Sequence, residues 1–532
     1  MKLRVMLATL ACALLLPLVA TAATPRWTYT TKGIVFQRLT SLGTLLVSSD
    51  DALRVINPAD GSVVWERKDL AKFKECNFDE IENTPYGMLD IGEGMGGRMR
   101  HVEVIDLQTG QKKWDSEGLP ILSSQGQIQV AHKRMLVIFG LAKKGNKPMT
   151  VAVDTETGEI KWQQERLFEK PLLLFEVKGS GRMFKRYSIE GNQPAAFPDE
   201  NSMVVWLTED GPVKINLENG NKEWACAGLK GKTPAAMNYG FCGMLSADGV
   251  IYVPYEKSLQ AVSAKTGELL WKKEKDFRGR PCQMMIVDQG IVVRGASFMD
   301  GDKPKGKPFI DVLNPQTGES VWKKPFKDLE DATSFAVDGE RVYICADNEM
   351  HSVALADGTD QILAKFKFKE GEVPTSLTLR DGGFLLTSSQ SLLKLEKGGK
   401  EEWRAYYPAP GQAGWIKVVS TVAVMASNAA AAGAAYDRAQ RYGGTQTYYV
   451  SGNPELSRRF KATTSGYDYR YILTSVDDGG KKRPGLVKVA KKDGKVVSSV
   501  GLGDKTPEYE VDELEGLIYF KKSDDVIEAY AL

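Results

Sequence analysis

The chain is 532 residues long and has 70 basic and 68 acidic residues, which give a formal net charge of +2. A net charge so close to zero provides no bulk attraction to nucleic acid or to an anionic membrane surface. The length far exceeds what one hydrophobic core requires, which favours an architecture that grows by repeating a unit.

The first 23 residues have the pattern of a secretory signal peptide. Lys2 and Arg4 precede an apolar run, and Ala20-Thr21-Ala22 follows it as an Ala-x-Ala cleavage motif. We therefore expect an exported protein whose mature chain lacks residues 1–23. Cys12 lies inside the apolar run and Thr9 stands where a lipobox has an aliphatic residue, so the pattern does not favour lipidation, although it leaves it open.

A turn glycine followed four residues later by tryptophan recurs along the chain. Seven copies are complete: Gly61 with Trp65, Gly110 with Trp114, Gly158 with Trp162, Gly220 with Trp224, Gly267 with Trp271, Gly318 with Trp322, and Gly399 with Trp403. Two weaker copies at Gly358 and Gly494 keep the turn and lose the tryptophan. Most of the glycines are about 40–50 residues apart, which is the period of a propeller blade.

Residues 249–272 show what one repeat contains. The β-branched and aromatic residues from Val250 to Val253 predict a strand, and two polar turns then separate it from two further strands, the last of which ends at Trp271. A unit of three or four strands cannot bury its apolar face alone, so it requires neighbours of its own kind.

Residues 405–465 interrupt the repeat. Positions 418–436 hold no charged residue and eight alanines, and Trp415, Val418, Val422 and Met425 fall on one stripe at helical spacing. We expect a helix that packs across its own ring or is offered to a partner. The length is just sufficient for a transmembrane span, but the segment is poorly apolar, so no span is expected in the mature chain.

The two ends of the mature chain are complementary. The last 17 residues predict two strands and stop before a tryptophan strand, whereas the chain from Arg26 to Tyr29 supplies such a strand. We expect the ends to share one blade, which removes an open sheet edge.

The repeat Asp-x-x-Thr-Gly-x-x-x-Trp, as in Asp106 to Trp114, resembles the PQQ-like β-propeller repeat. That family includes the quinoprotein dehydrogenases and the outer-membrane assembly lipoprotein BamB. The resemblance implies an all-β ring of four-stranded blades at residues 24–404 and 466–532, in which each tryptophan docks on the next blade. Eight blades are usual in the family and are expected here, with ten if every repeat is a complete blade.

Four long connections between second and third strands are expected on the same face as the 405–465 insert, because strands in a blade alternate in direction. They span residues 92–100, 143–147, 300–307 and 477–483, and most are basic. Together with the insert stripe, their lysines are the expected partner-binding residues: Lys143, Lys144, Lys303, Lys305, Lys481 and Lys482.

No catalytic, cofactor-binding or metal-binding motif emerges from the sequence. The three histidines fall in different repeats, and no Gly-x-Ser-x-Gly or His-Glu-x-x-His occurs. Quinoprotein dehydrogenases hold PQQ with calcium and often with a disulfide between adjacent cysteines, but no two cysteines are adjacent here. PQQ and calcium are therefore not supported by motifs. A disulfide between Cys226 and Cys242 and two buried thiols are equally acceptable interpretations.

The favoured hypothesis is a non-enzymatic scaffold or adaptor, BamB-like, which is periplasmic or associated with the outer envelope and binds envelope proteins through the insert and the basic loops. The alternatives are a PQQ-dependent oxidoreductase and a propeller that binds a glycan or small ligand in its channel. The sequence does not indicate an oligomeric state.

Overall fold

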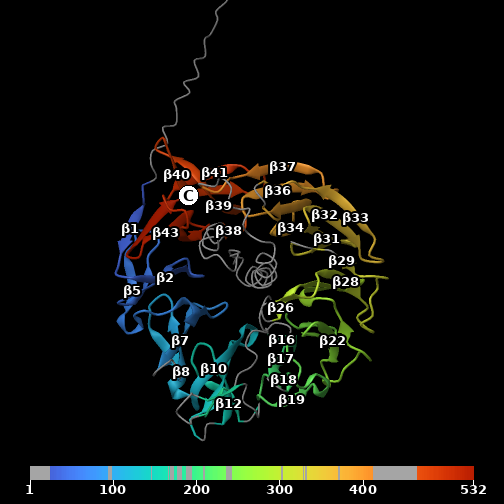
Figure 1. Cartoon of the computed structure of the whole chain (residues 1–532). Coiled ribbons are helices and arrows are strands. Elements are labelled where there is room, and N and C mark those ends of the chain that lie inside the picture. The colour runs from blue at the N-terminus through green and yellow to red at the C-terminus, as the bar shows by residue number, and fades with distance from the viewer. Residues whose placement is uncertain are drawn as a thin grey trace, which may run out of the picture.

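A computed structural model describes residues 24–532 except for 94–98, 145–146, 166, 168–172, 177–182, 187–194, 208–209, 235–241, 301–302, 328, 330–331, 370–371 and 411–463. The described strands form ten four-stranded antiparallel sheets, which stand radially as the blades of a closed ring (Figure 1). The expectation of eight blades was therefore wrong. Every repeat, including the two that lack tryptophan, is a complete blade.

Blades 1–9 each run from their innermost to their outermost strand in chain order. Blade 1 consists of β2 (Ile34–Leu39), β3 (Leu45–Ser49), β4 (Leu53–Ile56) and β5 (Val63–Arg67). Blade 2 consists of β6 (Phe78–Glu80), β7 (Tyr86–Glu93), β8 (Met99–Asp106) and β9 (Lys112–Asp115). Blade 3 consists of β10 (Ile121–Val130), β11 (Met135–Ala142), β12 (Pro148–Asp154) and β13 (Ile160–Glu165). Blade 4 consists of β16 (Ala196–Asp199), β17 (Ser202–Leu207), β18 (Gly211–Asn216) and β19 (Lys222–Ala225). Blade 5 consists of β20 (Leu245–Ala247), β21 (Val250–Tyr255), β22 (Ser258–Ser263) and β23 (Lys275–Asp276). Blade 6 consists of β24 (Arg280–Val287), β25 (Gly290–Ala296), β28 (Phe309–Leu313) and β29 (Phe326–Lys327).

The remaining blades continue the ring to the C-terminus. Blade 7 consists of β30 (Ala336–Asp338), β31 (Arg341–Ala346), β32 (Glu349–Ala354) and β33 (Asp360–Lys365). Blade 8 consists of β34 (Ser376–Arg380), β35 (Gly383–Thr387), β36 (Ser391–Glu396) and β37 (Glu401–Tyr406). Blade 9 consists of β38 (Thr464–Ser465), β39 (Tyr469–Asp478), β40 (Lys481–Ala490) and β41 (Val496–Gly501). Blade 10 combines β42 (Glu508–Asp512), β43 (Leu517–Ser523) and β44 (Val526–Ala531) with β1 (Trp27–Thr30).

Further short elements lie in the connections. Two hairpins stand outside the blades, β14 (Leu173–Glu176) with β15 (Met183–Arg186), and β26 (Phe298–Asp300) with β27 (Lys303–Lys305). The 3-10 helices of the described residues are η1 (Lys68–Leu70), η2 (Glu75–Asn77), η3 (Ser116–Gly118), η4 (Ala131–Lys133) and η5 (Ala227–Leu229). The helix expected within 405–465 falls on residues 411–463, which lie outside the described residues.

The hydrophobic core lies between neighbouring blades. The second and third strands of a blade are buried on both faces, as in β17, where all six residues are buried. One apolar cluster, for example, combines Val137 and Phe139 of blade 3 with Met203 and Val205 of blade 4. Each blade therefore supplies half of two cores, which makes stability a sum over neighbouring pairs.

The expected ring closure is confirmed. Strand β1 pairs antiparallel with β44, with Trp27 opposite Ala529 and Thr30 opposite Val526. The first strand of the described chain thus becomes the outermost strand of the last blade, beside β44 and in the same sheet as β43, which Figure 1 labels. β1 thus completes the four-stranded sheet of blade 10 from the other end of the described chain.

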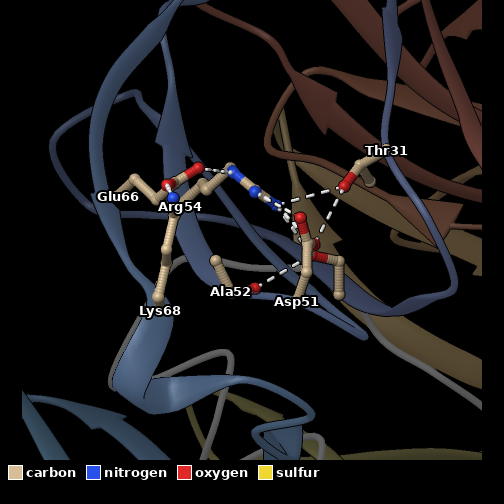
Figure 2. A network of polar contacts seen from close by, with 7 residues as sticks. Thr31, Asp51, Ala52, Arg54, Glu66 and Lys68 are labelled. Carbon is tan, nitrogen blue, oxygen red and sulfur yellow. Dashed lines mark hydrogen bonds and ion pairs between the residues drawn. The ribbon is translucent and has the colours of Figure 1, made fainter.

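A buried arginine fastens this closure (Figure 2). Arg54, which is 7% exposed, binds both carboxylate oxygens of Asp51 at 2.9 and 2.7 Å, and its Nε donates to Glu66 at 2.6 Å. It also donates to the hydroxyl of Thr31, just beyond β1, at 3.1 Å. These charge-assisted bonds hold the pKa of Asp51 well below its usual range. The network therefore links the chain that leaves blade 10 to blade 1.

The antiparallel order also defines two faces of the ring. The loops between second and third strands and the connections between blades lie on one face, called the insert face here. The loops between first and second strands, and the glycine turns between third and fourth strands, lie on the other, called the turn face.

Candidate binding face

The predicted docking tryptophans lie between consecutive blades. The ring of Trp65 in blade 1 lies against Gly110 in the turn of blade 2, and its Nε1 donates to the carbonyl oxygen of Leu107 at 2.8 Å. A Cβ at Gly110 would lie 2.6 Å from the indole, so only glycine fits there. The same contact joins Trp27 to Gly61, Trp114 to Gly158, Trp162 to Gly220, Trp224 to Gly267, Trp271 to Gly318, Trp322 to Gly358 and Trp403 to Gly494.

Blade 7 shows what replaces a missing tryptophan. Leu363 of β33 lies against Gly399 in the turn of blade 8, where a Cβ would approach it to 2.6 Å. Trp403 of blade 8, which lies against Gly494 of blade 9, is only partly buried. These residues join consecutive blades of the ring.

Three additions to the basic blade lie on the insert face. The β14–β15 hairpin belongs to the connection from blade 3 to blade 4, and the β26–β27 hairpin to the loop between β25 and β28. The third is the connection from β37 to β38, which includes residues 411–463. The sequence predicts the loop with the β26–β27 hairpin and the connection from β37 to β38. It does not predict the β14–β15 hairpin, although the larger spacing from Gly158 to Gly220 indicates an addition there.

The β26–β27 hairpin carries Lys303 and Lys305, and both side chains are exposed. Their register partners on β26 are Asp300 and Phe298. The guanidinium of Arg280, from β24, lies 4.6 Å from the centre of the Phe298 ring. This cation–π contact holds the hairpin against blade 6.

Lys481 and Lys482 lie at the tip of the long β39–β40 hairpin in blade 9. Their register partners are Asp478 and Asp477, and Arg483 forms an ion pair with Asp478 at 3.2 Å. Acidic residues directly across the hairpin thus offset its positive charge. This tip is less basic as a surface than its lysines suggest.

Lys143 and Lys144 lie beyond β11 in blade 3, and both are exposed. The Nζ of Lys143 donates to the carbonyl oxygen of Glu117, which belongs to η3 in the preceding blade connection. Blades 3, 6 and 9 are well separated around the ring, so the six predicted lysines share a face without forming one patch. The other predicted residues, Trp415, Val418, Val422 and Met425, lie outside the described residues.

A buried carboxylate that the sequence gave no reason to select organises the insert face at blade 8. Glu372, 6% exposed, accepts hydrogen bonds from the hydroxyls of Ser388 at 2.9 Å and Ser391 at 2.7 Å, and from the Gln390 amide at 2.5 Å. The Gln390 carbonyl oxygen in turn accepts a bond from the Tyr407 amide at 2.9 Å. This network fixes the backbone from which the 411–463 segment departs.

The histidines and cysteines are dispersed. His101, His132 and His351 lie in blades 2, 3 and 7, and the described residues contain no group of three or more His, Cys, Asp or Glu that could hold a metal ion. Cys226 is a buried free thiol, so the disulfide with Cys242 is not formed. No helix among the described residues is long and apolar enough to cross a membrane.

Comparison with known proteins gives one family match. The model described as outer membrane protein assembly factor BamB matches residues 98–274 and 150–307. Quinoprotein ethanol dehydrogenase of Pseudomonas aeruginosa is 38% identical over 85 residues, which are 15% of this chain and 13% of that protein. The alignment thus spans a small part of that enzyme's length.

Two solved structures resemble the chain at low sequence identity. BamB from Moraxella catarrhalis is 12% identical, with a TM-score of 0.33, and the alignment covers 71% of this chain and 98% of that one. Quinohemoprotein alcohol dehydrogenase from Comamonas testosteroni is 14% identical, with a TM-score of 0.32, and coverage of 77% and 82%. Neither likeness bears on function. The repeat and the ring of four-stranded blades are those of a PQQ-like β-propeller, and the family model matches the part of the chain from residue 98 to residue 307.

Proposed function

We propose that the protein is an exported scaffold that binds other proteins of the cell envelope through its insert face. The observation that carries the proposal is the placement of the additions: two extra hairpins and the longest connection all belong to that face. The turn face has short, repeated turns instead. Binding residues concentrate on loops that a rigid scaffold positions, so this asymmetry supports the insert face as the binding surface.

The family match supports the same class of function. The matching model is described as an assembly factor of the outer membrane, which favours an envelope protein as the partner and an envelope location. The pattern of residues 1–23 favours export. Residues 415–425 and the lysines at positions 143, 144, 303, 305, 481 and 482 are the proposed contact residues.

Site-specific photo-crosslinking in the intact host would test this proposal. A photoreactive residue would replace Lys144 or Asp524, exposed on the insert face, or Glu340, exposed on the turn face. Discrete adducts from Lys144 or Asp524, and none from Glu340, are expected. Equal adducts from both faces, or none from the insert face, would remove the support for a dedicated binding face.

Deleting residues 411–452 separates the insert from the rest of that face. The ring is expected to remain folded because β37 and β38 lie outside the deletion, while the adducts are expected to disappear. Retained adducts would show that the insert is dispensable for binding.

A PQQ-dependent oxidoreductase is the second candidate, favoured by the 38% identity over 85 residues to the ethanol dehydrogenase. Our proposal includes neither PQQ nor calcium. Titration of the mature protein with PQQ, followed by calorimetry and absorbance with and without calcium, decides between the two. Saturable, calcium-dependent binding would replace the scaffold proposal with the enzymatic one.

A further inference from the structure

The β26–β27 hairpin and the chain beside its base form a basic part of the described insert face. Residues 277–280 and 298–307 together hold five cations, Arg278, Arg280, Lys303, Lys305 and Lys307, against two acidic residues. The excess is three positive charges. At the β39–β40 tip, Lys481 and Lys482 each face an aspartate across the hairpin, whereas at β26–β27 Lys303 faces Asp300 and Lys305 faces Phe298.

The base of the hairpin is fixed to the ring by backbone contact. The Lys307 amide donates to the Arg278 carbonyl oxygen at 3.0 Å. A Cβ at Gly279 would lie 2.5 Å from the Lys307 oxygen, and one at Gly306 would lie 3.1 Å from Gly279. The two glycines thus allow the chains to touch, and Arg280 stacks on Phe298 above them. These contacts hold the hairpin in a fixed position on blade 6, where it forms a platform.

Two features of this platform specify what it can bind. β26 and β27 pair with each other and with no other strand in the described ranges, so each keeps an open edge of backbone donors and acceptors. Lys303 and Lys305 are two residues apart on β27, so strand alternation puts them on the same side of the hairpin. Within the described part of the chain, neither Lys303 nor Lys307 forms an ion pair.

From this juxtaposition we propose that the β26–β27 hairpin captures an acidic, extended segment of the partner protein as an added strand. The backbone of the segment pairs with the open edge, and its alternate carboxylates face Lys303 and Lys305. Lysines on an edge strand disfavour neutral or basic strands, so the same charges select an acidic one. This inference rests on the proposed binding role of the insert face and names the chemistry of its partner.

A synthetic peptide provides the test. The probe is a fluorescein-labelled peptide of alternating glutamate and threonine, added to the full mature chain and followed by fluorescence anisotropy. Saturable binding that weakens as salt is added is expected. Lys303→Glu with Lys305→Glu should weaken it by about tenfold or more. The matched variant, Lys230→Glu with Lys367→Glu, changes as many charges on exposed connections of the same face and should leave it unchanged.

A second probe tests the added strand itself. The same peptide with alternate backbone amides methylated keeps every carboxylate but loses the donors on one edge, so its binding should fall to the level of the charge-reversed variant. Equal binding of the methylated peptide would overturn strand addition. An equal loss of peptide binding in the hairpin variant and in its matched control would show that only general electrostatic attraction is measured. That result would also overturn the proposal.

Other polyanions give the remaining outcomes. Binding of heparin or of vesicles containing anionic phospholipid, without binding of the peptide, would overturn the choice of a protein segment. If the charge-reversed variant fails to fold by circular dichroism, Lys303→Gln with Lys305→Gln replaces it. Absence of peptide binding together with crosslinks from Lys144 would end this inference and leave the scaffold proposal standing. Absence of both would end the two together.

Discussion

At the scale of single residues, the ring depends on glycines that lie directly against tryptophans. Gly220 has φ +75°, and a Cβ there would lie 2.2 Å from Trp162. Gly231 has nearly the same backbone, with φ +74°, but nothing lies within 4 Å of its Cβ position. The pair separates the cost of the left-handed backbone from the cost of the contact between blades.

Gly220→Ala is therefore expected to destabilise the protein more than Gly231→Ala. The left-handed backbone alone costs an alanine about 1 kcal/mol, and displacement of the indole adds about 1–3 kcal/mol at Gly220. Urea denaturation followed by tryptophan fluorescence measures both. Equal midpoints for the two variants would show that the glycine–tryptophan contact contributes nothing beyond backbone conformation.

A second residue-scale prediction concerns the carboxyl group of Glu510 on β42. Burial raises its pKa to about 7, and the Glu75 carboxylate adds to this, whereas a backbone hydrogen bond at Leu39 and the charge of Arg38 oppose it. An unfolded glutamate titrates near pH 4.3. Between these values the folded chain holds a proton that the unfolded chain has lost, so stability falls as pH rises from about 4.5 to 7.

Glu510→Gln is expected to remove this decline. The variant should match the parent at pH 4.5 and exceed it by about 1–3 kcal/mol at pH 8. Urea denaturation across this pH range measures the difference. Glu508→Gln, which replaces an exposed carboxyl on the same strand, is the control and should keep the parent's decline. An unchanged pH dependence in Glu510→Gln would contradict the assignment.

At the scale of elements, closure depends on one four-residue strand that long-range contacts keep in place. Arg54 ties Thr31, beyond the end of β1, to Asp51 and Glu66 of blade 1. Removing the guanidinium leaves two partly exposed carboxylates without their partner. Arg54→Leu should therefore cost about 1–3 kcal/mol and speed hydrogen exchange of the β1 amides.

Arg67→Leu is the matched control for this experiment. Arg67 binds Asp69 at 2.5 Å and Glu103 at 2.8 Å, and so links blade 1 to blade 2 without contact to β1. Its loss should also lower stability but leave exchange in β1 unchanged. Equal exchange in β1 for both variants would show that the Arg54 network does not act on closure in particular.

The sequence predicted these elements where local pattern decides structure, and failed where distant residues combine. The turn glycines and Trp65 to Trp403 marked the repeat, and the terminal strands marked the closure. Eight blades were expected because eight is usual in the family, whereas the repeat count indicated ten. A repeat without the tryptophan still forms a complete blade, since Leu363 takes the place of the tryptophan between blades 7 and 8. Glu372 could not be selected, since its partners are 16–19 residues away and serines are ordinary loop residues.

The candidate binding face was likewise predictable where local pattern decides structure and not where distant residues meet. Strand alternation was sufficient to place the basic loops and the insert on one face. Which residue faces each lysine depends on cross-strand register, which the sequence did not show: Lys481, Lys482 and Lys303 each face an aspartate, and Lys305 faces Phe298. The β14–β15 hairpin escaped notice because its short strands lack the glycine–tryptophan mark.

At the scale of the whole molecule, ten blades that contact only their neighbours make the ring sensitive to where the chain is interrupted. The first and last described residues lie at blade 10, where the register of β1 and β44 places residue 24 opposite residue 532. A short linker can therefore join them, as in a hairpin. New ends can then be placed either within a blade or between two blades.

Two circular permutants of residues 24–532 test whether a shared blade closes the ring. Opening the exposed turn between Lys397 and Gly398 makes β37 the first strand and leaves blade 8 to be completed from both ends, as blade 10 is now. Opening between Asp504 and Lys505 separates blade 9 from blade 10 and leaves only packing to hold them. The first permutant should keep a thermal midpoint within about 2–4 °C of the parent, and the second should fall by more. Equal midpoints would show that packing between blades suffices to close a ring of ten, and that the shared strand adds no stability of its own.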